Sequence, residues 1–127
     1  MPARTALILT LASVVGWFVA ALFIHWAAPL GWFDGGTANV ILFVASLPVA
    51  FLTVELVRRF VPTGQATLGC ALLTTPALVL DGLALTWAPA LYGNHPGGPN
   101  HGSTWLLYGV GAILAAALWR DLTGRRP

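Results

Sequence analysis

The stretch from Leu68 to Trp87, LGCALLTTPALVLDGLALTW, decides the fold of this 127-residue chain. It supplies the roughly 20 apolar residues that a helix needs to cross a bilayer, yet it carries an acid, Asp81, well inside its length. Steps of three and four residues place Asp81 in a row of small side chains, which consists of Cys70, Thr74, Ala77, Asp81, Ala84 and Ala88. Because membrane helices pack through small residues, we expect this row to contact protein and to keep Asp81 away from lipid.

Two roles for Asp81 are open. An ionisable residue inside a membrane span is by default a candidate functional residue. The chain has no lysine, and no arginine lies at the depth of Asp81, so we expect burial to keep the carboxyl protonated. In that form it either donates a hydrogen bond to a neighbouring helix, which is a structural role, or exchanges its proton for a cationic substrate, which is a transport role.

Prolines interrupt two of the apolar stretches. Pro76 precedes Asp81 in the same stretch, and Pro48 lies near the centre of an earlier one. Since proline cannot donate a backbone hydrogen bond, we expect a kink in each helix, which serves either as a structural bend or as a hinge of a transporter. Trp17, in the middle of the first apolar stretch, needs a protein partner or water for its indole N–H.

Composition places the chain in a membrane. Its residues are 57% hydrophobic and only 8% charged, against about 25% charged in soluble domains. Four helices are expected, at about residues 5–26, 40–57, 66–87 and 104–119. The first is longer than the roughly 7–15 apolar residues of a signal peptide, so we expect a retained helix. The sequence predicts an all-α integral membrane four-helix bundle that forms one domain over residues 1–127.

The connections favour two antiparallel helical hairpins. Two similar segments, Trp26-Ala-Ala-Pro-Leu-Gly-Trp and Trp87-Ala-Pro-Ala-Leu-Tyr-Gly, follow the first and third helices, as two hairpins of the same sense would require. All arginines then fall on one side, and they are Arg4, Arg58, Arg59, Arg120, Arg125 and Arg126. By the positive-inside rule, both termini face the cytoplasm, and the net charge of +2 reflects topology rather than nucleic-acid binding. Glu55 stands three and four residues before Arg58 and Arg59, which predicts an ion pair at the inner interface.

Histidines gather on the predicted outer side. His25, His95 and His101, together with Asp34, form a polar outer rim, which is either solvated or a metal or pH-sensing site. Their spacing matches no established ligand motif. The single cysteine, Cys70, excludes an intramolecular disulfide. No nucleophile–base pair, phosphate-binding glycine loop or metalloprotease signature occurs, so we expect neither catalytic activity nor a cofactor.

The segment LVLDGLALTWAPALYGN (residues 78–94), with the polar loop and the last helix that follow it, resembles a family of small bacterial four-helix membrane proteins known only as a domain of unknown function. The resemblance implies the four-helix layout with Asp81 in the third helix, and it implies no activity. Small multidrug exporters are similar in size and helix count, but their working carboxylate lies in the first helix, where this sequence has none.

Two functions follow as expectations. One is a structural or accessory module of the membrane, which acts through helix packing with itself or within a larger complex. The other is an oligomeric proton-coupled transporter of a small or cationic substrate that uses Asp81.

Overall fold

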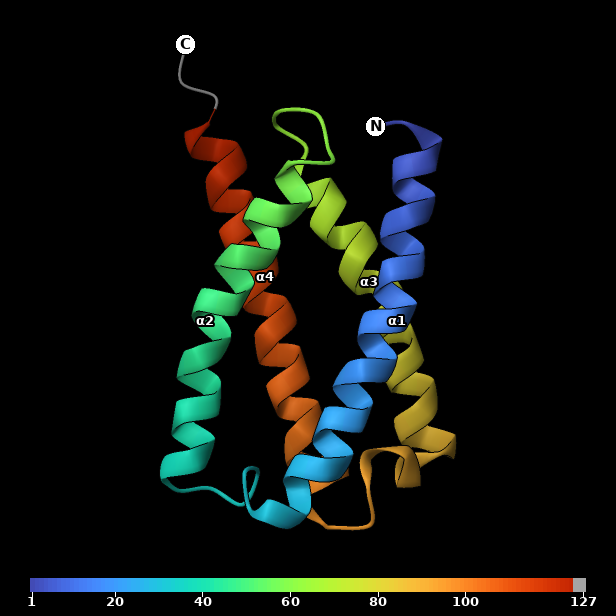
Figure 1. The fold of residues 1–127 in the computed structure, drawn as a ribbon, viewed down its shortest axis with the longest axis vertical. Coiled ribbons are helices and arrows are strands. Elements are labelled where there is room, and N and C mark those ends of the chain that lie inside the picture. The colour runs from blue at the N-terminus through green and yellow to red at the C-terminus, as the bar shows by residue number, and fades with distance from the viewer. Residues whose placement is uncertain (125–127) are drawn as a thin grey trace.

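The computed structural model describes residues 1–124 and contains, in that range, four long helices, short helical turns and no strand (Figure 1). The helices are α1 (Ala3–Ala27), α2 (Thr37–Arg58), α3 (Ala66–Trp87) and α4 (Ser103–Thr123). All four are long and apolar enough to cross a membrane. The predicted all-α membrane bundle is therefore confirmed.

Helix α3 has the bounds expected from the sequence, and the other three helices are longer than expected. The difference is largest in α4, which continues past Trp119 to Thr123. Hydropathy marks the apolar part of a helix, whereas its hydrogen-bonded turns continue into polar residues such as Arg120 and Asp121. The apolar spans and the helices are thus related but not identical segments.

Consecutive helices run in opposite directions, as two hairpins require (Figure 1). The most extensive packing, however, joins α1 to α3 and α2 to α4, and each of these pairs is parallel. Helix α3 also packs on α4, whereas α1 and α2 have little or no direct contact. Helix α3 therefore contacts all three other helices. The hairpin of α1 and α2 is held to the hairpin of α3 and α4 chiefly by the contacts of α1 with α3 and of α2 with α4.

Small side chains allow α3 to approach its neighbours, as its sequence predicts. Cys70, Thr74 and Asp81 of the predicted row are buried. At Gly69 an added Cβ would lie 2.7 Å from Val57 Cγ1, so the contact between α2 and α3 has no room for a side chain there. Close backbone approach of this kind takes the place of the hydrophobic drive that lipid does not provide.

The two ends of the bundle differ in character. We call the end with Arg4, Arg58, Arg59 and Arg120 the basic end, and the end with the connections 28–36 and 88–102 the loop end. At the loop end, the similar sequence segments fold alike, into the 3₁₀ turns η1 (Ala28–Leu30) and η2 (Pro89–Tyr92). Each turn is followed by a glycine with positive φ, which a side chain would strain.

The loop end is a packed structure with a core of its own. Ile24, Phe33 and Tyr92 are almost fully buried there. The π-helical turn η3 (Gly98–Gly102), which leads into α4, lies so close to α1 that a Cβ at Gly102 would be 2.6 Å from Ile24 Cγ2. The connections therefore pack against the helices at the loop end and fix the position of Tyr92.

Candidate functional site

Asp81 lies at a meeting point of three segments. The indole N–H of Trp17, from α1, donates a hydrogen bond to Asp81 Oδ1 at 3.0 Å. The hydroxyl of Tyr92, from η2, donates to the same oxygen and lies 3.2 Å from Trp17 Nε1. We call Trp17, Asp81 and Tyr92 the Asp81 cluster. Its acid is only 8% exposed and its tyrosine is fully buried.

Local structure explains how Tyr92 reaches Asp81. After α3 ends at Trp87, Pro89 starts the 3₁₀ turn η2, and Gly93 ends it with a φ of 96°. This turn directs the chain back over the bundle, so that Tyr92 lies against the helix it has just left. The sequence predicted that Trp17 needs a partner, and the structure provides two, Asp81 and Tyr92.

The phenol of Tyr92 remains a proton donor over the physiological range. Burial is the main cause that raises the pKa of Tyr92 far above its ordinary value of 10.0, and the hydrogen bond to Asp81 raises it further. A tyrosine in this state has one O–H to donate, and it donates it to the carboxyl. The link between η2 and α3 is therefore fixed in direction.

A cavity of about 230 Å³ between α3 and α4 borders the cluster. Asp81 lines it together with apolar residues such as Leu78 and Leu106, and Ser103 adds a hydroxyl. The acid is therefore both held by donors of its own chain and placed at the wall of a small space.

A second polar contact joins α1 and α3 near Pro76. The N–H of Ala77, the residue after the proline, donates to Ser13 Oγ at 3.0 Å, and Ser13 is buried. Proline opens a helix locally, and a side chain from a neighbouring helix can then bind the backbone groups. Pro48, by contrast, is exposed on α2. Both prolines lie inside continuous helices.

The four residues of the predicted outer rim do not form one cluster. His25 Nδ1 lies 3.2 Å from the carbonyl oxygen of Leu91, and His101 is exposed. Asp34 and His95 approach each other, with 3.6 Å between Oδ1 and Nδ1. Within residues 1–124, no group of three or more histidine, cysteine or acidic side chains is placed to hold a metal ion. His25 instead lies against η2, which packs on α1.

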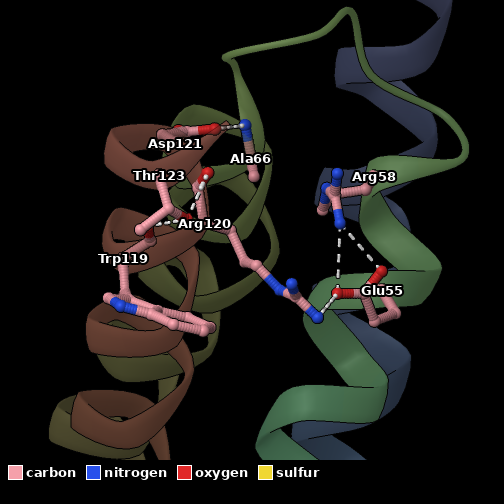
Figure 2. A network of polar contacts seen from close by, with 7 residues as sticks. All are labelled: Glu55, Arg58, Ala66, Trp119, Arg120, Asp121 and Thr123. Carbon is pink, nitrogen blue, oxygen red and sulfur yellow. Dashed lines mark hydrogen bonds and ion pairs between the residues drawn. The ribbon is translucent and has the colours of Figure 1, made fainter. Parts of the chain in front are cut away.

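At the basic end, Glu55 joins two helices (Figure 2). Arg58 lies 2.9 Å from Glu55 Oε2, as the spacing predicts, and Arg120 of α4 lies 2.6 Å from Oε1. Arg59 was expected in this pair and is not part of it. Helix α2 ends at Arg58, which leaves Arg59 exposed beyond the last turn, and Arg120 binds the second oxygen of Glu55 instead.

Asp121 is a site residue that the sequence analysis missed. Its two carboxylate oxygens accept the backbone N–H groups of Ala66 and Thr67, at 3.0 and 2.8 Å. These N–H groups belong to the first turn of α3, so α4 caps a helix that lies more than 50 residues earlier in the chain. One signal was available: Asp121 follows Ala117 by one helical turn, and Ala117 ends a run of three alanines, residues 115–117, of the kind that packs against another helix.

No family model, no curated protein and no solved structure matches this chain. The resemblance of residues 78–94 to a bacterial family therefore stays a prediction.

Proposed function

We propose that this chain is a structural or accessory module of a membrane, non-catalytic and without a cofactor, which acts through helix packing with itself or within a larger complex. The observation that carries the proposal is the pair of hydrogen bonds at Asp81, whose donors belong to α1 and η2. Two donors on one carboxyl oxygen are suited to a fixed link between segments. The acid thus has a structural role that needs no substrate.

Other polar groups of the helices support the same proposal, because each of them joins two elements. Ser13 accepts from α3, and Asp121 of α4 caps α3. The indole of Trp105, in α4, donates to Ser46 Oγ of α2 at 2.8 Å. In lipid, where apolar side chains give little drive for association, such links and close packing set the arrangement of the helices.

We further propose that the protein lies in a bacterial inner membrane with both termini in the cytoplasm. The arginines of the basic end support this orientation by the positive-inside rule. Labelling from outside tests it with two exposed threonines, in a Cys70→Ser background. Thr37→Cys should be labelled in intact cells and Thr63→Cys only after the membrane is opened. Labelling of both from the same side would refute the four-span topology.

A second candidate is the oligomeric proton-coupled transporter of a small or cationic substrate. The cavity of about 230 Å³ beside Asp81 favours it, because a transported cation would need an acid at the wall of its binding site. In this case the carboxyl would release and bind its proton during each cycle.

Two substitutions of Asp81 separate the candidates. Asp81→Asn keeps the shape of the acid and an oxygen that accepts from Trp17 and Tyr92. Asp81→Leu leaves the Tyr92 hydroxyl without its acceptor and the Trp17 N–H with the Tyr92 oxygen alone. For a structural module, Asp81→Asn should retain the unfolding midpoint and the oligomeric state, and Asp81→Leu should lower the midpoint. Proton flux into vesicles should be the same with and without the protein.

A transporter differs in the proton flux. Wild-type vesicles would then show a proton flux coupled to a cation, and Asp81→Asn would fold normally but abolish it. Val79→Leu serves as the matched control, because Val79 lies on the same helix and is exposed. A coupled flux that is lost in Asp81→Asn and kept in Val79→Leu would overturn the structural proposal.

A further inference from the structure

A polar cavity of about 310 Å³ lies at the basic end, between the connection from α2 to α3 and the last turn of α4. Its charged lining consists of Arg58, Arg59, Arg120, Glu55 and Asp121. We call this cavity the arginine pocket. Figure 2 shows part of its wall, where the side chain of Arg120 reaches from α4 toward Glu55 on α2. The proposed structural function uses Asp121 as a helix cap but does not use the arginines of the pocket.

The pocket contains more donors than its own acids satisfy. Asp121 is directed to the N–H groups of Ala66 and Thr67, and Glu55 accepts from Arg58 and pairs with Arg120. Arg120 Nε is buried and has no hydrogen-bond partner among residues 1–124. The guanidinium of Arg59 likewise forms no ion pair or hydrogen bond with any residue of that range. A negatively charged ligand would satisfy these groups.

The depth of the pocket points to the headgroup layer of a bilayer. Trp119, beside it on α4, is 53% exposed, and the guanidinium carbon of Arg120 lies 5.3 Å from the centroid of its ring. Phe60, at the end of α2, is exposed as well. Aromatic rings at helix ends lie at the level of lipid headgroups, and Figure 2 shows that Trp119 and Arg120 come from the same turn.

We propose that the arginine pocket binds a phosphate group, of the kind that an anionic phospholipid presents at this depth. The planar guanidinium groups of Arg59 and Arg120 match phosphate geometry, since each can donate two parallel hydrogen bonds to it. Glu55 competes with the phosphate, because it already binds Arg58 and Arg120. Removing the charge of Glu55 should therefore strengthen phosphate binding, whereas removing the charge of Arg59 should weaken it.

Native mass spectrometry of the full chain in detergent measures the binding. Phosphatidylglycerol is the anionic probe, phosphatidylcholine the zwitterionic reference and inorganic phosphate the soluble probe. Wild-type protein should retain phosphatidylglycerol more tightly than phosphatidylcholine. Arg59→Gln should weaken the binding of phosphatidylglycerol about fivefold, which is the effect of one basic residue near a membrane surface. Glu55→Gln should tighten it, whereas a merely structural role of Glu55 would leave binding unchanged or weaker.

Arg4→Gln is the matched control, because Arg4 lies at the same end of the bundle, is exposed and does not line the pocket. It should bind phosphatidylglycerol as the wild type does. If Arg4→Gln loses as much affinity as Arg59→Gln, binding reflects the overall charge of the basic end and the proposal is wrong. Equal retention of the two lipids would also overturn it.

The source of the phosphate is decided by the soluble probe. If millimolar inorganic phosphate binds alone, displaces phosphatidylglycerol and shows the same dependence on Arg59 and Glu55, the pocket takes phosphate from water. If it does not compete while phosphatidylglycerol binds with the predicted dependence, the ligand is the lipid. Arg59→Gln keeps the test informative even if Glu55→Gln, which removes the link to Arg120, fails to fold, because the guanidinium of Arg59 is exposed and has no partner in residues 1–124.

Discussion

Single polar side chains connect the helices, and Ser13 shows how small such a link is. Its hydroxyl accepts the N–H of Ala77 directly after Pro76. We predict that Ser13→Ala lowers the free energy of unfolding in detergent micelles by about 1 kcal/mol, because the Ala77 N–H loses this acceptor. Thr53→Val is the control, since Thr53 bonds only to the carbonyl of Val49 in its own helix. Equal losses in the two variants would contradict the link between α1 and α3.

Tyr92 makes the free energy of unfolding depend on pH in the alkaline range. Because burial and Asp81 raise the pKa of Tyr92 in the folded protein above its ordinary value of 10.0, the folded state retains a proton that the unfolded state loses. The contribution of the Tyr92 hydroxyl to the free energy of unfolding is therefore fully present below pH 10. It declines by about 1.4 kcal/mol per pH unit as the pH rises from 10 toward the pKa of the folded state.

Tyr92→Phe checks this pH dependence. The difference in unfolding free energy between wild type and Tyr92→Phe should stay constant at neutral pH and shrink above pH 10. If the difference in unfolding free energy between wild type and Tyr92→Phe does not change across that range, the Tyr92 hydroxyl titrates alike in the folded and unfolded states.

Some of these residues could be predicted from the sequence and others could not. The inward aim of Asp81 and the need of Trp17 for a partner follow from local chemistry, because an acid and an indole in lipid each require a protein contact. Tyr92 could not be assigned to Asp81, since their contact depends on the fold of η2 and its packing on α1. Arg59 was placed in an ion pair because helical spacing takes no account of where α2 ends.

At the level of elements, Asp121 determines how α3 begins. Its carboxylate accepts two N–H groups of the first turn of α3, which no residue of the preceding connection caps. We predict that Asp121→Ala lowers the unfolding free energy by about 1–2 kcal/mol, the usual cost of losing a helix cap. Thr123→Ala is the matched control, because the exposed Thr123 bonds only within α4.

Hydrogen exchange can also show where in the chain Asp121→Ala loses its hydrogen bonds. Hydrogen exchange in Asp121→Ala should rise at Ala66 and Thr67, whose N–H groups lose their acceptors, and should stay unchanged at the loop end. Unchanged exchange at both residues would contradict the capping role.

The helices were predictable because hydropathy is a local property that each segment carries by itself. The pairing of helices was not, since it depends on which faces fit together. The small row of α3 correctly predicted a protein contact. On α1, Ser13 and Ile24 face the bundle, and the small residues Ala12 and Gly16 are exposed in the single subunit.

For the whole molecule, the exposed small residues of α1 are available to a second copy. We predict a dimer in membranes and mild detergent that Gly16→Leu weakens, because a large side chain would prevent close helix approach. A Cβ at Gly16 meets nothing within 4 Å, so the subunit itself should tolerate the change. Gly111→Leu is the matched control, with equal space on α4.

Crosslinking should give less dimer for Gly16→Leu than for Gly111→Leu. The reverse order would place the interface on α4. A monomer for the wild type in both settings, without a partner that co-purifies, would contradict self-association and leave the accessory role without a partner.

The central claim is that Asp81 is a structural link, and a double-mutant cycle between Asp81 and Tyr92 tests it most directly. Unfolding free energies of Asp81→Ala, Tyr92→Phe and the double variant, measured in the same micelles, give the coupling between the two side chains. We expect a favourable coupling of about 0.6–1.7 kcal/mol, because hydrogen bonds between membrane helices contribute about 0.6 kcal/mol on average and about 1.7 kcal/mol at most. A coupling of zero, with Asp81→Ala as stable as the wild type, would contradict it.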